Sequence, residues 1–310
     1  MSSASPIVSV IILSYDRPEY LRQALASMRA QSYENLELIV VDNPSPQSGE
    51  IAEIVGAHAG ARLVQNAANL GYAGGMNRGI ERARGHYVYL TEDDIALDAD
   101  CIRHLVEHMD ERASGGLISP IMYNKTAGTI RCAGGEMALG GIYRRRTHGE
   151  GQRDRGQFAR PFGVTYVDGA TMFARAELLR RLGGFREEYF MYVEAVELCA
   201  RVLRAGEKIE VVPRAKVYHF EPPEGANTSP QFDFHKFKNL FSLYLLHAPA
   251  RVLPEFFLRY ALLTPLRSLA GSRAASTPAM LKALLWIARR APALLRERRG
   301  GGLPSALGFK

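Results

Sequence analysis

Cysteine is scarce in this chain, which has three in 310 residues and none spaced as Cys-x-x-Cys. Neither a disulfide framework nor a zinc site is indicated by that number and spacing. The first residues also lack the basic segment followed by an apolar one that marks a secretory signal peptide. Both absences favour a reducing compartment, so we expect a cytoplasmic protein.

The motifs of two common nucleotide-binding folds are absent as well. No Walker sequence occurs anywhere in the chain. The glycine-rich stretch at residues 69–75 does not follow the first predicted strand, where the Gly-x-Gly-x-x-Gly fingerprint of dinucleotide-binding proteins has to stand. A dinucleotide-binding domain is therefore rejected.

Positive charge is concentrated at the C-terminal end. The chain carries a net charge of +7, of which residues 251–310 contribute +9 and residues 1–250 contribute −2. The body has no basic stripe with interleaved aromatic side chains, which argues against a nucleic-acid partner.

The C-terminal region is predicted to be helical at residues 232–247, 251–263 and 280–299. None of these segments has the roughly 18 uninterrupted apolar residues that a membrane-spanning helix needs. Their apolar faces are edged by arginine, as in helices that lie on an anionic membrane surface. We expect peripheral contact with the inner face of the cytoplasmic membrane; a helical bundle docked on the body is the alternative.

Strand and helix patterns alternate through the first half of the chain. This alternation predicts an α/β fold in which a doubly wound, mostly parallel sheet carries helices on both faces. Residues 115–165 are less regular, and their basic run at 144–146 suits an edge hairpin or a surface that meets an anionic acceptor. Strands are predicted at residues 7–13, 36–41, 62–65, 85–91, 164–168, 171–175, 209–212 and 215–219, and helices at 18–28, 51–57, 76–83, 176–182 and 192–205.

The strand at residues 85–91 ends in three consecutive acids, Glu92, Asp93 and Asp94. Adjacent carboxylates repel one another, and a hard cation such as Mg²⁺ or Mn²⁺ would neutralise them. The alternative is a solvated turn that opens the next helix. Polar clusters also follow the first two strands, at residues 14–17 and 42–43, so three such clusters converge on the edge where ligands of doubly wound sheets bind.

Seven short motifs in this order resemble those of the family 2 glycosyltransferases of GT-A fold, particularly the rhamnosyltransferase-like and galactofuranosyltransferase-like branch. The resemblance covers about residues 6–222, which implies a catalytic domain at residues 1–222 and a basic helical extension at 223–310. The motifs lie at residues 8–18, 40–43, 69–79, 92–94, 167–170, 183–185 with 192–194, and 217–219.

The resemblance implies roles for individual residues. A divalent metal, Mg²⁺ or Mn²⁺, would be held by Glu92, Asp94 and His219. Asp168 and Gly169 would form a wall of the donor and acceptor site. The nucleotide would contact Tyr15, Arg17, Asp42, Asn43, Asn69 and Gly71.

An inverting transferase needs a general base for the acceptor hydroxyl. The family usually supplies it from a Glu-Asp pair at the start of a helix, and the position of that aspartate is Ala195 in this chain. Either Glu194 or Glu197 replaces it, on neighbouring faces of the helix, or turnover is impaired.

The resemblance therefore implies a metal-dependent inverting hexosyltransferase. It would move rhamnose or a hexose from a dTDP- or UDP-sugar to a glycan or lipid-linked acceptor in cell-surface polysaccharide synthesis. One alternative is a catalytically impaired sugar-nucleotide-binding protein on the same fold. The other is a nucleotidyltransferase, disfavoured because residues 14–18 hold no glycine-rich loop with a basic residue.

Overall fold

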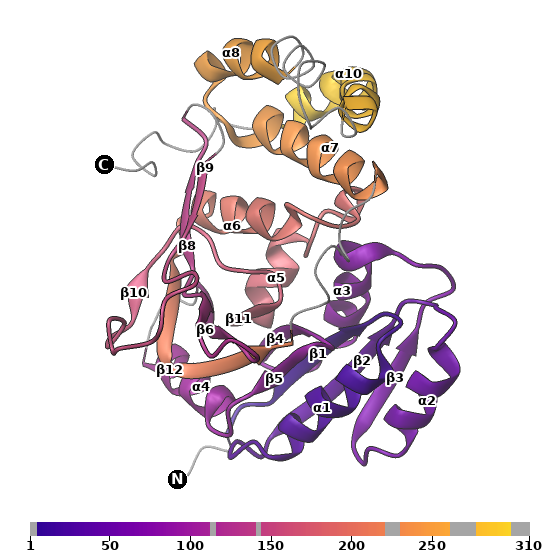
Figure 1. Ribbon diagram of the computed structural model, residues 1–310, viewed down its shortest axis with the longest axis vertical. Coiled ribbons are helices and arrows are strands. Elements are labelled where there is room, and N and C mark those ends of the chain that lie inside the picture. The colour runs from indigo at the N-terminus through magenta and orange to yellow at the C-terminus, as the bar shows by residue number, and fades with distance from the viewer. Residues whose placement is uncertain (1–4, 112–115, 141–143, 221–229, 261–276, 299–310) are drawn as a thin grey trace.

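The computed structural model describes residues 5–111, 116–140, 144–220, 230–260 and 277–298. Within these residues a mixed sheet of ten strands runs through the body, with helices against both of its faces (Figure 1). The α/β, mostly parallel architecture predicted from the sequence is confirmed. The predicted boundary between residues 222 and 223 lies outside the described residues.

The first four strands form a parallel half-sheet in the order β4-β1-β2-β3. Their central strand, β1, is buried along its whole length, as expected for a parallel strand covered on both faces. The strands are β1 (Val8–Ser14), β2 (Leu36–Asp42), β3 (Ala61–Gln65) and β4 (Tyr87–Glu92).

Helices cover the two faces of the sheet and build two hydrophobic clusters. One face carries α1 (Pro18–Arg29), α2 (Ser48–Gly56) and α4 (Cys101–Asp110). The other carries α3 (Gly71–Arg82), α5 (Ala176–Leu182) and α6 (Glu194–Arg204), with the 3₁₀ turn η1 (Glu187–Tyr189) before α6.

The helix predicted at residues 76–83 begins earlier, at Gly71, so the glycine-rich stretch is mostly helical. The reason is close packing. A Cβ on Gly75 would lie 2.4 Å from Leu13 Cδ1, and one on Gly79 would lie 2.3 Å from Ile11 Cγ2. The glycines let α3 approach β1 more closely than any other residue would.

The second half of the sheet is mixed, and three predictions are corrected there. The strands predicted at 209–212 and 215–219 are one strand, β12, with a register shift between Val212 and Lys216. The acids after β4 lead into another strand, β5, instead of a helix. Residues 164–168 form only an isolated bridge at Tyr166. The remaining strands are β5 (Ile95–Leu97), β6 (Leu117–Asn124), β7 (Ile130–Cys132), β10 (Phe162–Gly163), β11 (Thr171–Arg175) and β12 (Ile209–His219), with β8 (Gly135–Ala138) and β9 (Arg144–Thr147) as a separate hairpin.

The C-terminal helices stack over α6, on the side away from the sheet (Figure 1). They are α7 (Pro230–His247), η2 (Ala250–Val252), α8 (Leu253–Leu258) and α10 (Thr277–Glu297). The helix predicted at 251–263 is a 3₁₀ turn followed by α8, and its last residues lie outside the described ones. Phe241 and Tyr244 of α7 are fully buried in the same cluster as α6, so the core of the body continues into these helices.

Candidate active site

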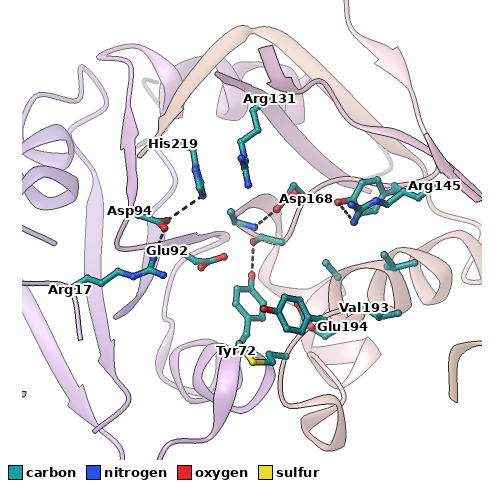
Figure 2. A pocket seen from close by; sticks show the side chains of 17 residues that line it. Arg17, Tyr72, Glu92, Asp94, Arg131, Arg145, Asp168, Val193, Glu194 and His219 are labelled. Atoms are coloured by element: carbon teal, nitrogen blue, oxygen red, sulfur yellow. Dashed lines mark hydrogen bonds and ion pairs between the residues drawn. The ribbon is translucent and has the colours of Figure 1, made fainter. Parts of the chain in front are cut away.

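A pocket of about 310 Å³ opens where β4 and β12 end and α6 begins. Figure 2 shows side chains from distant parts of the sequence pointing into it. It gathers most of the residues that the sequence analysis placed at the metal, the acceptor wall and the base. The predicted residues that line it are Arg17, Glu92, Asp94, Asp168, Gly169, Glu194 and His219.

The three consecutive acids after β4 divide between two roles. Glu92 and Asp94 line the pocket, whereas Asp93 turns toward the end of β1. The Asp93 carboxylate accepts hydrogen bonds from Ser14 Oγ at 2.9 Å and from the backbone N–H of Tyr15 at 3.1 Å. Asp93 thus ties the acidic turn to the neighbouring strand and leaves the two acids beside it facing the pocket.

Asp94 is almost completely buried between Arg17 and His219. Its Oδ2 lies 2.5 Å from Arg17 Nη1, and its Oδ1 lies 3.7 Å from His219 Nε2 (Figure 2). Oδ1 accepts no hydrogen bond. Arg17, predicted to contact a nucleotide phosphate, therefore pairs with the predicted metal ligand and lies at the edge of the same pocket.

The electrostatics of this end of the pocket favour a cation. Burial, together with the nearby charges of Asp94 and Asp168, raises the pKa of Glu92 well above its ordinary value. Two carboxylates and one imidazole are donors that Mn²⁺ accepts, and Mg²⁺ sites commonly use one or two carboxylates with waters and substrate phosphates. The residues fit a divalent ion. Among the described residues no three His, Cys, Asp or Glu side chains already form a complete metal-binding group.

Asp42 lies at the carboxyl end of β2, outside the lining of the pocket, and is a candidate for nucleotide contact. Its side chain is buried, which raises its pKa, and it accepts hydrogen bonds from Ser48 and Gln65. Oδ1 has no hydrogen-bond partner. A buried acceptor without a donor suits the N–H or hydroxyl groups of a nucleoside. Tyr15, whose ring is exposed at the end of β1, keeps its predicted stacking role as a prediction.

Asn43, Asn69 and Gly71 shape the loop before α3 and do not line the pocket. Asn43 Oδ1 accepts from Asn66 Nδ2 and Leu70 N, while its Nδ2 donates to the carbonyl of Gly71. Asn69 Oδ1 accepts from Gly71 N at 2.8 Å. Gly71 has φ +67°, and a Cβ there would lie 2.3 Å from the carbonyl oxygen of Phe190. The structure thus explains these residues by the fold of the loop, whereas the sequence predicted direct nucleotide contact.

Glu194 is the first residue of α6, and its carboxylate belongs to the pocket wall opposite the acidic turn (Figure 2). Burial, with a smaller effect from the charge of Asp168, raises its pKa to about 7. Its Oε2 is buried and accepts no hydrogen bond. A carboxylate with a pKa near neutrality and a free acceptor atom has the properties of a general base.

Glu197 lies one helical turn later and faces away from the pocket. Its carboxylate accepts hydrogen bonds from Arg201 Nε at 2.8 and 3.0 Å and from His247 Nε2 at 3.0 Å. Although burial would raise the pKa of Glu197, the His247 hydrogen bond and the Arg201 charge lower it. The alternative in which Glu197 acts as the base is therefore corrected: it is a buried structural ion pair between α6 and α7.

Several pocket residues were not singled out by the sequence analysis, among them Tyr72, Arg131, Arg145 and Tyr166. The hydroxyl of Tyr72 donates to the carbonyl of Gly169, which holds the predicted wall against α3. Arg145 lies over the ring of Tyr166, 5.1 Å from its centroid. The sequence signals were the basic run at residues 144–146 for Arg145 and the motif at residues 69–79 for Tyr72; nothing in the local sequence marks Arg131 or Tyr166.

Comparisons with known proteins agree with this geometry. The model of glycosyl transferase family 2 matches residues 9–183. An uncharacterized protein of Sinorhizobium fredii is 29% identical over 230 residues, 70% of this chain but only 25% of that protein. The N-acetylglucosaminyl-diphospho-decaprenol L-rhamnosyltransferase of Mycobacterium tuberculosis is 25% identical over 233 residues, 69% of this chain and 76% of that protein.

Solved structures share the fold. The crystal structure of GalNAc-T7 with UDP, GalNAc and Mn²⁺ superposes with a TM-score of 0.68, covering 96% of this chain and 59% of that chain. The sequence identity is 14%, so this likeness concerns the fold alone.

Proposed function

Because this chain belongs to glycosyl transferase family 2, we propose that it is an inverting transferase that moves a sugar from a nucleotide-sugar donor to an acceptor hydroxyl. One observation carries the proposal: the acids after β4 and the buried Glu194 line opposite walls of one pocket. The first wall suits a diphosphate with its metal, and the second suits the hydroxyl that attacks.

The proposed roles follow from these positions. Glu92, Asp94 and His219 would hold a divalent ion, Mg²⁺ or Mn²⁺, which would neutralise the charge on the departing nucleoside diphosphate. Glu194 Oε2 takes the proton of the acceptor hydroxyl, which must come within about 2.6–3.2 Å of it. The acceptor oxygen then forms its bond to the anomeric carbon as the bond to the diphosphate oxygen breaks on the opposite side.

For the donor we propose a dTDP-sugar or a UDP-sugar carrying rhamnose or a hexose. The relative named as a rhamnosyltransferase and the fold neighbour bound to UDP support these two classes. In this chain, Asp42 Oδ1 is the buried acceptor for the nucleoside, and the exposed ring of Tyr15 is a stacking surface.

For the acceptor we propose a glycan or a lipid-linked sugar of a cell-surface polysaccharide. Arg131 and Arg145 place positive charge on the pocket wall beside Asp168 (Figure 2). Guanidinium groups suit phosphate, which a lipid-linked acceptor carries.

Ala195 favours a second function, a sugar-nucleotide-binding protein without turnover. It stands at the position of the family's usual aspartate and lines the pocket beside Glu194. The two functions differ in whether Glu194 suffices as the base.

The test is release of nucleoside diphosphate. The protein is incubated with UDP- and dTDP-sugars plus Mn²⁺, with and without a lipid-linked acceptor fraction. We expect acceptor-dependent release of UDP or dTDP from one donor. Donor binding by calorimetry without release would support the second function, and neither binding nor release would contradict both.

We also propose that α10 lies on an anionic membrane surface, in keeping with a cytoplasmic protein bound peripherally. Leu281, Leu285 and Leu295 are about half exposed or more and lie on one side of the helix. The exposed side chains of Lys282 and Arg289 lie along its edge. Such a face matches an interfacial helix. No helix among the described residues is long and apolar enough to cross a bilayer.

The membrane proposal predicts weaker vesicle binding for the double variant Leu281→Glu with Leu285→Glu. Both side chains are exposed, so the fold should be unaffected while apolar contact is lost and negative charge is added. Co-sedimentation with phosphatidylcholine vesicles containing phosphatidylglycerol should fall at least tenfold, about 1.4 kcal/mol. The control is Ile7→Glu, an exposed apolar residue of the body. Equal binding of both variants and wild type would remove the proposal.

A further inference from the structure

We propose that Asn239 of α7 is a positioning residue for Glu194, because it holds the backbone before α6 in the shape that directs this carboxylate into the pocket. The inference rests on the proposed role of Glu194 as the base. It assigns a part of the active site to a helix far from every motif in the sequence.

The backbone before Glu194 is strained. Phe190, Tyr192 and Val193 have φ values of 63°, 66° and 69°, in the left-handed region that non-glycine residues rarely adopt. A branched side chain such as that of Val193 is especially unfavourable there. Such a residue persists only where its surroundings impose the conformation. The local sequence alone would not choose this path.

Asn239 supplies hydrogen bonds that hold the backbone before α6 in this conformation. The side chain is fully buried, and its Nδ2 donates to the carbonyls of Tyr189 at 2.8 Å, Met191 at 2.8 Å and Tyr192 at 2.7 Å. An amide group has two N–H donors, so these three acceptors share them. Without Asn239 these carbonyls would lose that donor, and a buried acceptor left without a donor is unfavourable.

The opposite side of the same segment is held by α3. The carbonyl of Phe190 accepts a hydrogen bond from the N–H of Ala73 at 3.1 Å, and Gly71 leaves room for it. The ring of Phe190 stacks on His235 of α7, with centroids 4.8 Å apart. The segment therefore lies between the first turn of α3 and α7.

α7 also holds the far side of the first turn of α6. His247, at the end of α7, donates to the fully buried Glu197 carboxylate at 3.0 Å. Asn239 and His247 thus contact the chain on both sides of Glu194, one before it and one after it. The position of Glu194 is set by two contacts with the same helix.

The test compares two buried residues of α7. Asn239→Leu keeps the size of the side chain and removes its donors. Ser242→Ala removes a hydroxyl that donates to Lys238 O within the helix and does not touch the strained segment. We expect Asn239→Leu to lower kcat about 100-fold, as misplacement by about 1 Å can do, with little change in donor KM. Ser242→Ala should keep the wild-type kcat.

A purely structural role for Asn239 would give a different result. Circular dichroism and active-site titration with donor give the fraction of folded molecules. If kcat per folded molecule of Asn239→Leu stays within about twofold of wild type, the proposal is overturned. Equal loss of kcat in both variants would overturn it as well.

A second readout is independent of turnover. Carbon-13 NMR of labelled glutamate carboxyls, with Glu194→Gln to assign the signal, follows the titration of Glu194. In Asn239→Leu its pKa should move from about 7 toward the ordinary value as the carboxylate becomes hydrated. An unchanged titration would contradict the inference. Should wild type release no diphosphate from any donor, the proposed function would fail while this measurement still tests Asn239.

Discussion

Replacing Asp94 by asparagine is expected to abolish metal-dependent binding of the nucleotide-sugar donor. The substitution keeps the shape of the side chain but removes the charge of a buried carboxylate whose Oδ1 accepts no hydrogen bond. Loss of a residue that only hydrogen-bonds to a metal ligand already costs about 10–100-fold in metal affinity, so loss of a direct ligand should exceed that range. Calorimetry with UDP or dTDP, with Mn²⁺ or with EDTA, measures the effect.

The neighbouring acid provides the matched control. Asp93→Asn alters the adjacent carboxylate, which turns away from the pocket and accepts from Ser14 and Tyr15. This variant should keep its Mn²⁺ dependence, because the amide oxygen can still accept from Ser14 and Tyr15. If donor binding by Asp94→Asn responds to Mn²⁺ as donor binding by wild type does, the metal assignment is wrong.

Glu194→Gln should lower kcat by about 10²–10⁴-fold, the usual contribution of a positioned general base. Donor affinity should remain, because the amide fills the same space. The base acts in its unprotonated form, and its pKa is raised to about 7. Wild-type kcat should therefore fall as pH decreases below about 7, and this limb of the pH profile should be absent from the variant.

The same substitution should make the folded protein more stable at alkaline pH. A carboxyl whose pKa is higher in the folded state than in the unfolded state favours folding at low pH. That contribution is lost as pH rises from the unfolded value to about 7. Glutamine avoids the cost of burying an ionised carboxylate. Urea unfolding of the variant at pH 8 should therefore show a gain in the free energy of unfolding on the order of 1–3 kcal/mol.

Glu197→Gln is the contrasting variant on the same helix. It breaks a fully buried pair with Arg201 and His247, which should destabilise the protein by roughly 3–5 kcal/mol. The folded fraction should retain the pH profile of wild type. If Glu197→Gln removes the limb near pH 7 and Glu194→Gln does not, the assignment of the base is reversed.

The parallel half of the fold could be predicted because its signals are local. The run at β1 is apolar at nearly every position, and a strand with both faces covered has that pattern. Glu92 and Asp94 were expected to act together at the end of β4, and both line the pocket.

The antiparallel half was harder to predict. β5 has three residues, and β7 and β10 are equally short or shorter, so no period can be recognised in them. They are strands because the long strands β12 and β6 offer them hydrogen-bonding edges. That is a contact between distant segments, and the sequence around each short strand does not encode it.

By itself, the sequence determined where the site lies: polar residues after buried parallel strands converge on one edge. The tertiary structure alone decided which residues reach it. Glu194 and Glu197 are equivalent by helical spacing. Glu197 is bound by Arg201 and by His247 of α7, whereas Glu194 lines the pocket. Periodicity records that a side chain is buried, whereas the identity of its partner depends on which distant helix packs against it.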